Sequence, residues 1–114
     1  MALTVTTTYP QPGLALASWE DLANGNQGNS ISIARWADKS VQVSGTFGVG
    51  GYITIEGSMD GTVWAALHDP QGNAITFAIA GIEFIVENTV LIRPNVTAGD
   101  GTTALDVDIL GSDR

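Results

Sequence analysis

From residue 30 onward, apolar and polar residues alternate with a period of two in short runs that turn-forming residues separate. Val41 and Val43 mark this alternation in one run, and Ile53 and Ile55 mark it in the next. Such alternation is typical of strands that bury one face. No run of ordinary helical length interrupts the series. The sequence therefore predicts an all-β, single-domain sandwich or jelly roll of about seven to eight antiparallel strands. The runs are SISIARW, KSVQVSGTFGV, GYITIEGS, TVWAALHD, NAITFAIAG, IEFIVENT, VLIRPNVT and TTALDVDILG.

The first 29 residues have a different character from the rest of the chain. They begin with a threonine-rich stretch, continue through Pro10 and Pro12, and end in the turn-forming run NGNQGN. Proline disfavours helix and favours extended backbone. Within LALASWEDLA, Leu14, Trp19 and Leu22 would share one side of a short helical turn. We expect an extended N-terminal arm over residues 1–29, of low stability on its own, and a sandwich domain over residues 30–114.

Two features of the expected strands predict local geometry. Pro94 lies in a strand-like run, and proline cannot donate to a β-ladder, so its strand should lie at a sheet edge or carry a bulge. The tripeptide Asp-Gly-Thr occurs twice, beginning at Asp60 and at Asp100. An Asp-Gly pair between alternating runs favours a tight hairpin, because glycine adopts positive φ without steric cost. We interpret both copies as turns, since a repeated tripeptide indicates a structural element more than a unique site.

The charge of the chain limits the classes of partner that we expect it to bind. Four basic residues stand against twelve acidic ones, for a formal net charge of −8. The basic residues are scattered, whereas binding to nucleic-acid phosphates needs clusters of Lys and Arg. We therefore expect no nucleic-acid partner and no adhesion to an anionic membrane. The first residues lack the basic start and long apolar run of a secretory signal, which favours synthesis in a cytoplasm.

Candidate chemistry is sparse. His68 is the only histidine, and the chain has neither a nucleophile-elbow motif nor a phosphate-binding loop. We expect no catalytic residue, no cofactor and no metal site, so the protein should not be an enzyme. A structural calcium is the one alternative that the acids leave open, although no EF-hand pattern is present. Its candidate ligands are Asp60, Asp69, Asp100, Asp106 and Asp108.

The three tryptophans are candidates for contacts within the fold or with partners. We expect Trp64, just after the first Asp-Gly-Thr, to anchor the core or its rim, with ligand stacking as the alternative. Trp36 could close one end of the sandwich. Trp19, in the expected arm, either folds back onto its own domain or docks on a partner, where tryptophan is a typical anchor. The candidate partner-contact residues are Tyr9, Pro10, Leu14, Trp19 and Trp36.

Several segments together resemble a known family. They are TTTYPQPGLALASWE, VQVSGTFGVGGYITIEGSMDGTVWAALHDPQGNAITF and IRPNVTAGDGTTALDVDI, and the resemblance spans about residues 1–112. Together they resemble small capsid decoration, or cement, proteins of tailed bacteriophages and prophages. The resemblance implies a β-sandwich on the outside of the head lattice, and it implies no catalytic residues. The pattern GS-DGT-W is also similar to galactose-binding-like sandwiches of the discoidin type, which keeps a carbohydrate-binding alternative open.

The expected function follows from this resemblance and from the charge. The chain would be a non-enzymatic virion structural protein, made in the host bacterial cytoplasm, that binds the outer capsid surface and stabilises the head. Its partners would be the major capsid protein and itself, with a homotrimer favoured over a dimer. The alternatives are a carbohydrate-binding module, with Trp64 and the loops near Asp60 and Asp100 forming a shallow site, and a tail or baseplate component.

Overall fold

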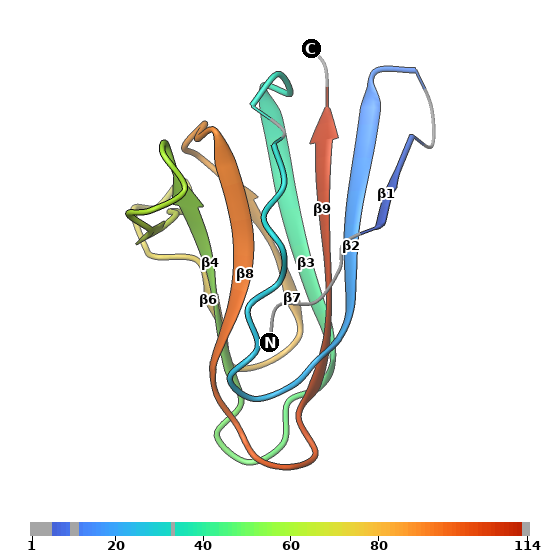
Figure 1. Cartoon of the computed structure of the whole chain (residues 1–114), viewed down its shortest axis with the longest axis vertical. Coiled ribbons are helices and arrows are strands. Elements are labelled where there is room, and N and C mark those ends of the chain that lie inside the picture. Colours follow the sequence, from blue (N-terminus) through green and yellow to red (C-terminus); the bar gives the residue numbers. More distant parts are fainter. Residues whose placement is uncertain (1–5, 10–11, 33, 113–114) are drawn as a thin grey trace.

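The computed structural model describes residues 6–9, 12–32 and 34–112, and within them it contains strands and no helix (Figure 1). All of the strand pairings are antiparallel. The prediction of an all-β sandwich is confirmed. The strands are β1 (Thr6–Thr8), β2 (Leu14–Leu22), β3 (Asp38–Thr46), β4 (Tyr52–Ser58), β5 (Ala65–Ala66), β6 (Thr76–Phe77), β7 (Gly81–Ile85), β8 (Leu91–Ala98) and β9 (Ala104–Ser112).

The strands form two sheets that pack face to face. The first sheet has five strands in the order β1-β2-β9-β3-β7. In the second, β4 is central, with β8 on one side and the two short strands β5 and β6 also paired to it. Strands alternate their side chains between faces, so each sheet sends every second residue into the space between the layers. The buried core consists of Ala15, Ala17, Trp19, Leu22, Ile31, Trp36, Val41, Val43, Ile53, Ile55, Leu67, Ile75, Phe77, Ile85, Ile92, Val96, Leu105, Val107 and Ile109.

The predicted boundary after residue 29 is wrong, because β2 is an inner strand of the five-stranded sheet. It lies between β1 and β9 and pairs with β9 from Leu14 to Leu22. Trp19 is only 1% exposed and packs in the core. The short helix considered for this segment is absent, since alternation in LALASW is satisfied by a strand. Residues 14–22 therefore belong to the sandwich and are not part of an arm.

A β-bulge explains why this strand was difficult to see in the sequence. Between Trp19 and Leu22 the register against β9 shifts, and Asp21 has a φ of 56°. Its backbone N–H donates to Oδ1 of Asp106 at 3.1 Å. A bulge inserts one extra residue and reverses the alternation that follows. Trp19 and Leu22, which an unbroken strand would place on opposite faces, both lie in the core.

The segment after β2 crosses to the second sheet and covers the outer edge of β8, where it is seen as the cyan trace beside β8 (Figure 1). Gly28 N–H donates to the carbonyl of Pro94 at 2.9 Å, and Ile31 and Ile92 exchange two backbone hydrogen bonds. A Cβ on Gly28 would lie 2.6 Å from the Trp19 ring, so only glycine fits there. β8 pairs with no named strand other than β4, which confirms the predicted edge position of Pro94. In a strand, N–H and C=O of one residue point the same way, so the missing N–H of Pro94 faces this segment and the β4 ladder stays intact.

At the end of the sandwich where β3 enters, a buried lysine connects two loops. The ammonium of Lys39 donates to the carbonyl of Trp36 at 3.0 Å and to Oδ1 of Asn88 at 2.7 Å. Asn88 in turn donates to the carbonyl of Ala34 at 2.9 Å. Burial lowers the pKa of Lys39, and the nearby Asp38 carboxylate opposes that shift. A Cβ on Gly111 would lie 2.7 Å from the Trp36 side chain, so glycine at this position lets Trp36 close this end of the core as the sequence predicts.

Candidate functional site

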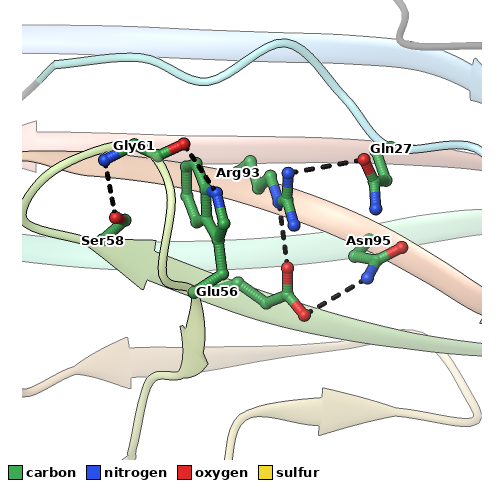
Figure 2. Close-up of polar contacts among 7 residues, drawn as sticks. Gln27, Glu56, Ser58, Gly61, Arg93 and Asn95 are labelled. Carbon is green, nitrogen blue, oxygen red and sulfur yellow. Dashed lines mark hydrogen bonds and ion pairs between the residues drawn. The ribbon is translucent and has the colours of Figure 1, made fainter.

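The outer face of the second sheet carries a polar cluster built on β4 and β8 (Figure 2). Glu56 faces outward because it alternates with the buried Ile55. Its Oε1 accepts from Nε of Arg93 at 2.9 Å, and its Oε2 accepts from Nδ2 of Asn95 at 3.2 Å. Arg93 also donates to Oε1 of Gln27 at 3.4 Å. The cluster satisfies its own charges.

Trp64 covers this cluster from the loop between β4 and β5. The guanidinium of Arg93 lies 4.0 Å from the centre of the indole ring, a cation–π contact. The indole Nε1 donates to the carbonyl of Gly61 at 3.2 Å. Trp64 therefore anchors a loop onto the outside of the sheet, whereas the sequence placed it in the core or at its rim.

The first Asp-Gly-Thr is a turn inside this loop. Oδ1 of Asp60 accepts from the backbone N–H groups of Thr62 and Val63, and Oγ of Ser58 accepts from that of Gly61. The bonds from Val63 and Thr62 are the main reason that the pKa of Asp60 is lowered. Gly61 has a φ of 81°, a left-handed backbone conformation that glycine adopts without steric cost. The carboxylate of Asp60 is used to hold the turn.

The second Asp-Gly-Thr lies in the connection from one sheet to the other, so it is not a hairpin turn. It connects β8 to β9, whereas β8 pairs with β4 and β9 pairs with β2 and β3. Oδ2 of Asp100 accepts from Val49 N–H at 2.9 Å, and its Oδ1 accepts from the backbone and hydroxyl of Thr102. These bonds lower the pKa of Asp100 to about 2. The hydroxyl of Thr103 donates to the Phe47 carbonyl at 2.7 Å, so this turn is joined to the β3–β4 connection.

The positions of the two turns argue against the carbohydrate site that the sequence left open. Ser58 pairs with Leu91, and Tyr52 pairs with Ala98, so Asp60 follows one end of β4 and Asp100 lies beside the other. A shallow site that combines both aspartates with Trp64 is thus excluded by the strand register.

His68 and Glu87 form an exposed pair on the loops around β5 and β7. Nδ1 of His68 lies 2.5 Å from Oε2 of Glu87, and Oε1 of Glu87 accepts from His68 N–H at 2.7 Å. Burial would raise the pKa of Glu87, but the bonds from His68 outweigh it and lower that pKa. Across the described ranges, no three His, Cys, Asp or Glu side chains are grouped to hold a metal ion.

The outer face of the five-stranded sheet has a different character, because it carries an apolar groove of about 410 Å³. Its shape follows from the register. Leu16, Leu110, Ser40 and Phe84 lie in one row across β2, β9, β3 and β7. The small Ser40 side chain stands between the large ones, so the surface is hollowed over β3. The residues that line the groove are Leu14, Leu16, Ser40, Val41, Gln42, Ile82, Asp108 and Leu110.

The five predicted contact residues are placed in different environments. Tyr9, just after β1, is 70% exposed, and Leu14 lines the apolar groove. Trp19 and Trp36 are buried, so in this fold neither side chain is available to anchor a partner. Pro10 lies outside the described residues.

Sequence reasoning missed the other apolar residues of this face. Ile82 and Phe84 are exposed on β7, and Leu110 is half-buried on β9. The available signal was a break in the alternation, since FIV at the end of GIEFIV and IL at the end of LDVDIL place large apolar residues at adjacent positions, and so on both faces. Adjacent large apolar residues indicate a strand whose outer face is also covered by apolar groups, either in its own fold or by a partner.

Comparisons with known proteins add a fold relationship. No family model and no curated protein matches the chain. Among solved structures, the crystal structure of the SPBc2 prophage-derived protein YomS is similar, with a TM-score of 0.60 over 91% of this chain and 98% of that one. The sequence identity is 11%, so the likeness shows a shared fold. Separately, among the described residues no helix is long and apolar enough to cross a membrane.

Proposed function

We propose that this chain is a non-enzymatic bacteriophage or prophage virion protein that binds the outer surface of the capsid and stabilises the head. The observation that carries the proposal is the apolar groove on the five-stranded sheet, a hollowed apolar surface on an otherwise acidic protein. Exposed apolar surface of this kind marks protein–protein contact sites. The shared fold with a prophage-derived protein and the resemblance to decoration proteins support the phage setting.

The charge supports the outer surface as the location. A capsid interior faces packaged DNA, whose phosphates repel a protein with a net charge of −8. On the outside this repulsion is weaker. There, each copy would bridge neighbouring capsid subunits, and binding at several sites at once would strengthen attachment through avidity. Added contacts between subunits raise the free energy needed to rupture a head under DNA pressure.

The polar groups support a structural role over an enzymatic one. Asp60 and Asp100 hold turns, and Glu56 is bound to Arg93 and Asn95. Catalytic carboxylates need to face a substrate across a cleft. Here these carboxylates hold backbone and side-chain partners of their own fold.

The test is addition of the purified protein to heads that lack it. We expect the protein to co-sediment with the heads and to raise the temperature at which they release DNA. Phe84→Lys, on the face with the groove, should abolish both effects. Tyr52→Lys is the matched control, because Tyr52 is 40% exposed on the opposite sheet and Phe84 is 39% exposed.

The contrary result is a protein that stays in the supernatant at every protein concentration, or heads whose DNA release is unchanged when it binds. A virion reconstruction separates the capsid from the tail and baseplate. Density for this sandwich on the tail alone would overturn the capsid location, and the same map gives the number of copies around each symmetry axis.

A further inference from the structure

Carboxylates lie along one margin of the apolar groove. Asp108 lines it, Asp106 is two residues away on the same face of β9, and Glu20 is exposed on β2. The hydroxyl of Ser18 donates to Oδ1 of Asp108 at 2.6 Å, which fixes that carboxylate beside the groove. An apolar surface with fixed negative charge at its margin selects partners by charge as well as by shape.

The basic residues of this sheet do not reach its outer face. Lys39 is the one Lys or Arg in β1, β2, β3, β7 and β9, and its ammonium points inward to Trp36 and Asn88. The carboxylates are more numerous in the same strands. At outer-face positions they are Glu20, Asp38, Asp106 and Asp108, whereas Glu83 pairs with the buried Val41 and so lies at an inner-face position.

A second copy of this chain is a poor occupant for the groove. Packing of this face on that of a second copy would bring together two acidic surfaces, each with Asp106 and Asp108, in a protein that already carries −8. Like charges facing each other at an interface oppose binding. The occupant that complements the face has apolar side chains for the hollow over Ser40 and positive charge beside them.

We propose that the apolar groove binds a protein segment that presents large apolar side chains flanked by Lys or Arg. The inference rests on the proposed function for the setting, since there the segment belongs to the capsid surface. The groove volume of about 410 Å³ lies within the range of ligand-binding clefts in proteins. The apolar part supplies most of the affinity, and the charges supply orientation and on-rate.

The first test uses two synthetic peptides, one alternating Leu with Lys and one alternating Leu with Glu, titrated into the whole protein and followed by amide NMR. We expect the Leu/Lys peptide to shift the amides of Ser40, Gln42 and Leu110 and to leave those of Thr54 and Glu56 unchanged. Asp108→Asn should weaken binding of the Leu/Lys peptide about three-fold, and a higher salt concentration should weaken this binding further. Ile82→Ser should weaken it by roughly ten-fold.

Three results would overturn the inference. They are equal binding of both peptides, no shift in the groove amides with either peptide, and a concentration-dependent dimer of the protein that Phe84→Lys abolishes. The last would show that a second copy occupies the face. Because Ile82 and Phe84 are exposed, near-ultraviolet circular dichroism should confirm that both variants keep the fold.

The second test separates this inference from the proposed function. Hydrogen exchange of the protein bound to heads should protect β3, β7 and β9. Protection confined to β4 and β8 would overturn the groove as the contact and leave capsid binding standing. Binding of the Leu/Lys peptide without any binding to heads would overturn the capsid setting and leave the groove specificity standing.

Discussion

The two outer faces of the sandwich are built from the same strand geometry and differ in how their polar and apolar groups are satisfied. On the four-stranded sheet, Glu56 and Arg93 pair with each other and Trp64 covers the arginine. On the five-stranded sheet, Leu110 and Phe84 flank a hollow and the nearest carboxylate, Asp108, has no cation from its own sheet. A face that satisfies its own charges gains little from a partner. The face with open apolar surface gains free energy when it is covered.

The difference also separates two uses of aromatic residues on the outer faces. Trp64 stacks on an arginine and donates its indole N–H to Gly61, so it stabilises a loop. Phe84 has no polar group and lies on a strand next to the hollow, where an apolar surface can cover it favourably. An exposed aromatic residue is therefore informative about binding only after its neighbours are known.

The largest effect on stability should come from a core substitution in β2, the strand that supplies one wall of the groove. Trp19→Ala should destabilise the protein by about 3–5 kcal/mol, because it removes a fully buried indole of β2 and its bond to the Asn29 carbonyl. Urea unfolding followed by circular dichroism measures the change. An arm outside the domain would give a variant with nearly unchanged stability, which is the outcome that contradicts the placement of β2.

The next comparison uses two isoleucines of one strand. Ile85 is 1% exposed in the core, and Ile82 is 65% exposed on the outer face. Ile85→Ala should cost about 3 kcal/mol of unfolding free energy, whereas Ile82→Ala should change it by less than about 0.5 kcal/mol. The same urea experiment measures both. Similar losses in the two variants would mean that the outer face is packed against something in the free protein.

A smaller effect is expected on the opposite face, within the polar cluster. Arg93→Ala should cost about 1–2 kcal/mol, because it removes the ion pair with Glu56 and the ring contact with Trp64. A double-mutant cycle with Glu56→Ala should give a coupling of about 1 kcal/mol. Gln27→Ala is the control, since its bond to Arg93 is 3.4 Å long. No coupling between Glu56 and Arg93 would show that the face does not stabilise itself.

The sequence was sufficient to predict the fold class and much of the core, because period-two alternation was clear in β3, β4 and β9. Val41, Ile53 and Ile109 all point inward as their patterns indicate. The alternation of β2 was concealed by the bulge at Asp21, which sets Trp19 and Leu22 on the same face. A local pattern cannot reveal a bulge in which Asp21 is held by a bond to Asp106, 85 positions away along the chain.

Of the five contact residues that the sequence singled out, only Leu14 lines the apolar groove. The apolar groove depends on which strands are neighbours, since Leu16, Leu110 and Phe84 become one row only in the order β2-β9-β3-β7. Strand order in a sandwich is set by long-range pairing, which alternation along the chain does not encode. The two Asp-Gly-Thr turns make the same point, because one closes a hairpin and the other joins two sheets.

The smallest effect concerns the corner that holds the two sheets, and so the two faces, in their relative positions. The folded pKa of Asp100, about 2, lies below its ordinary value of 3.8. Between these values the unfolded chain binds more protons than the folded one, so this contribution is complete above about pH 4 and is lost as pH falls toward 2. Asp100→Asn should therefore be less stable than the native protein at pH 7, and the gap should narrow by pH 2.5. Urea unfolding at pH 7, 4 and 2.5 measures this difference in stability.

Asn24→Ala, which removes an uncharged bond to the Gly99 carbonyl in the same corner, should show a stability difference from the native protein that does not change with pH. A gap for Asp100→Asn that is constant over the same range would mean that the ionised carboxylate does not hold the corner.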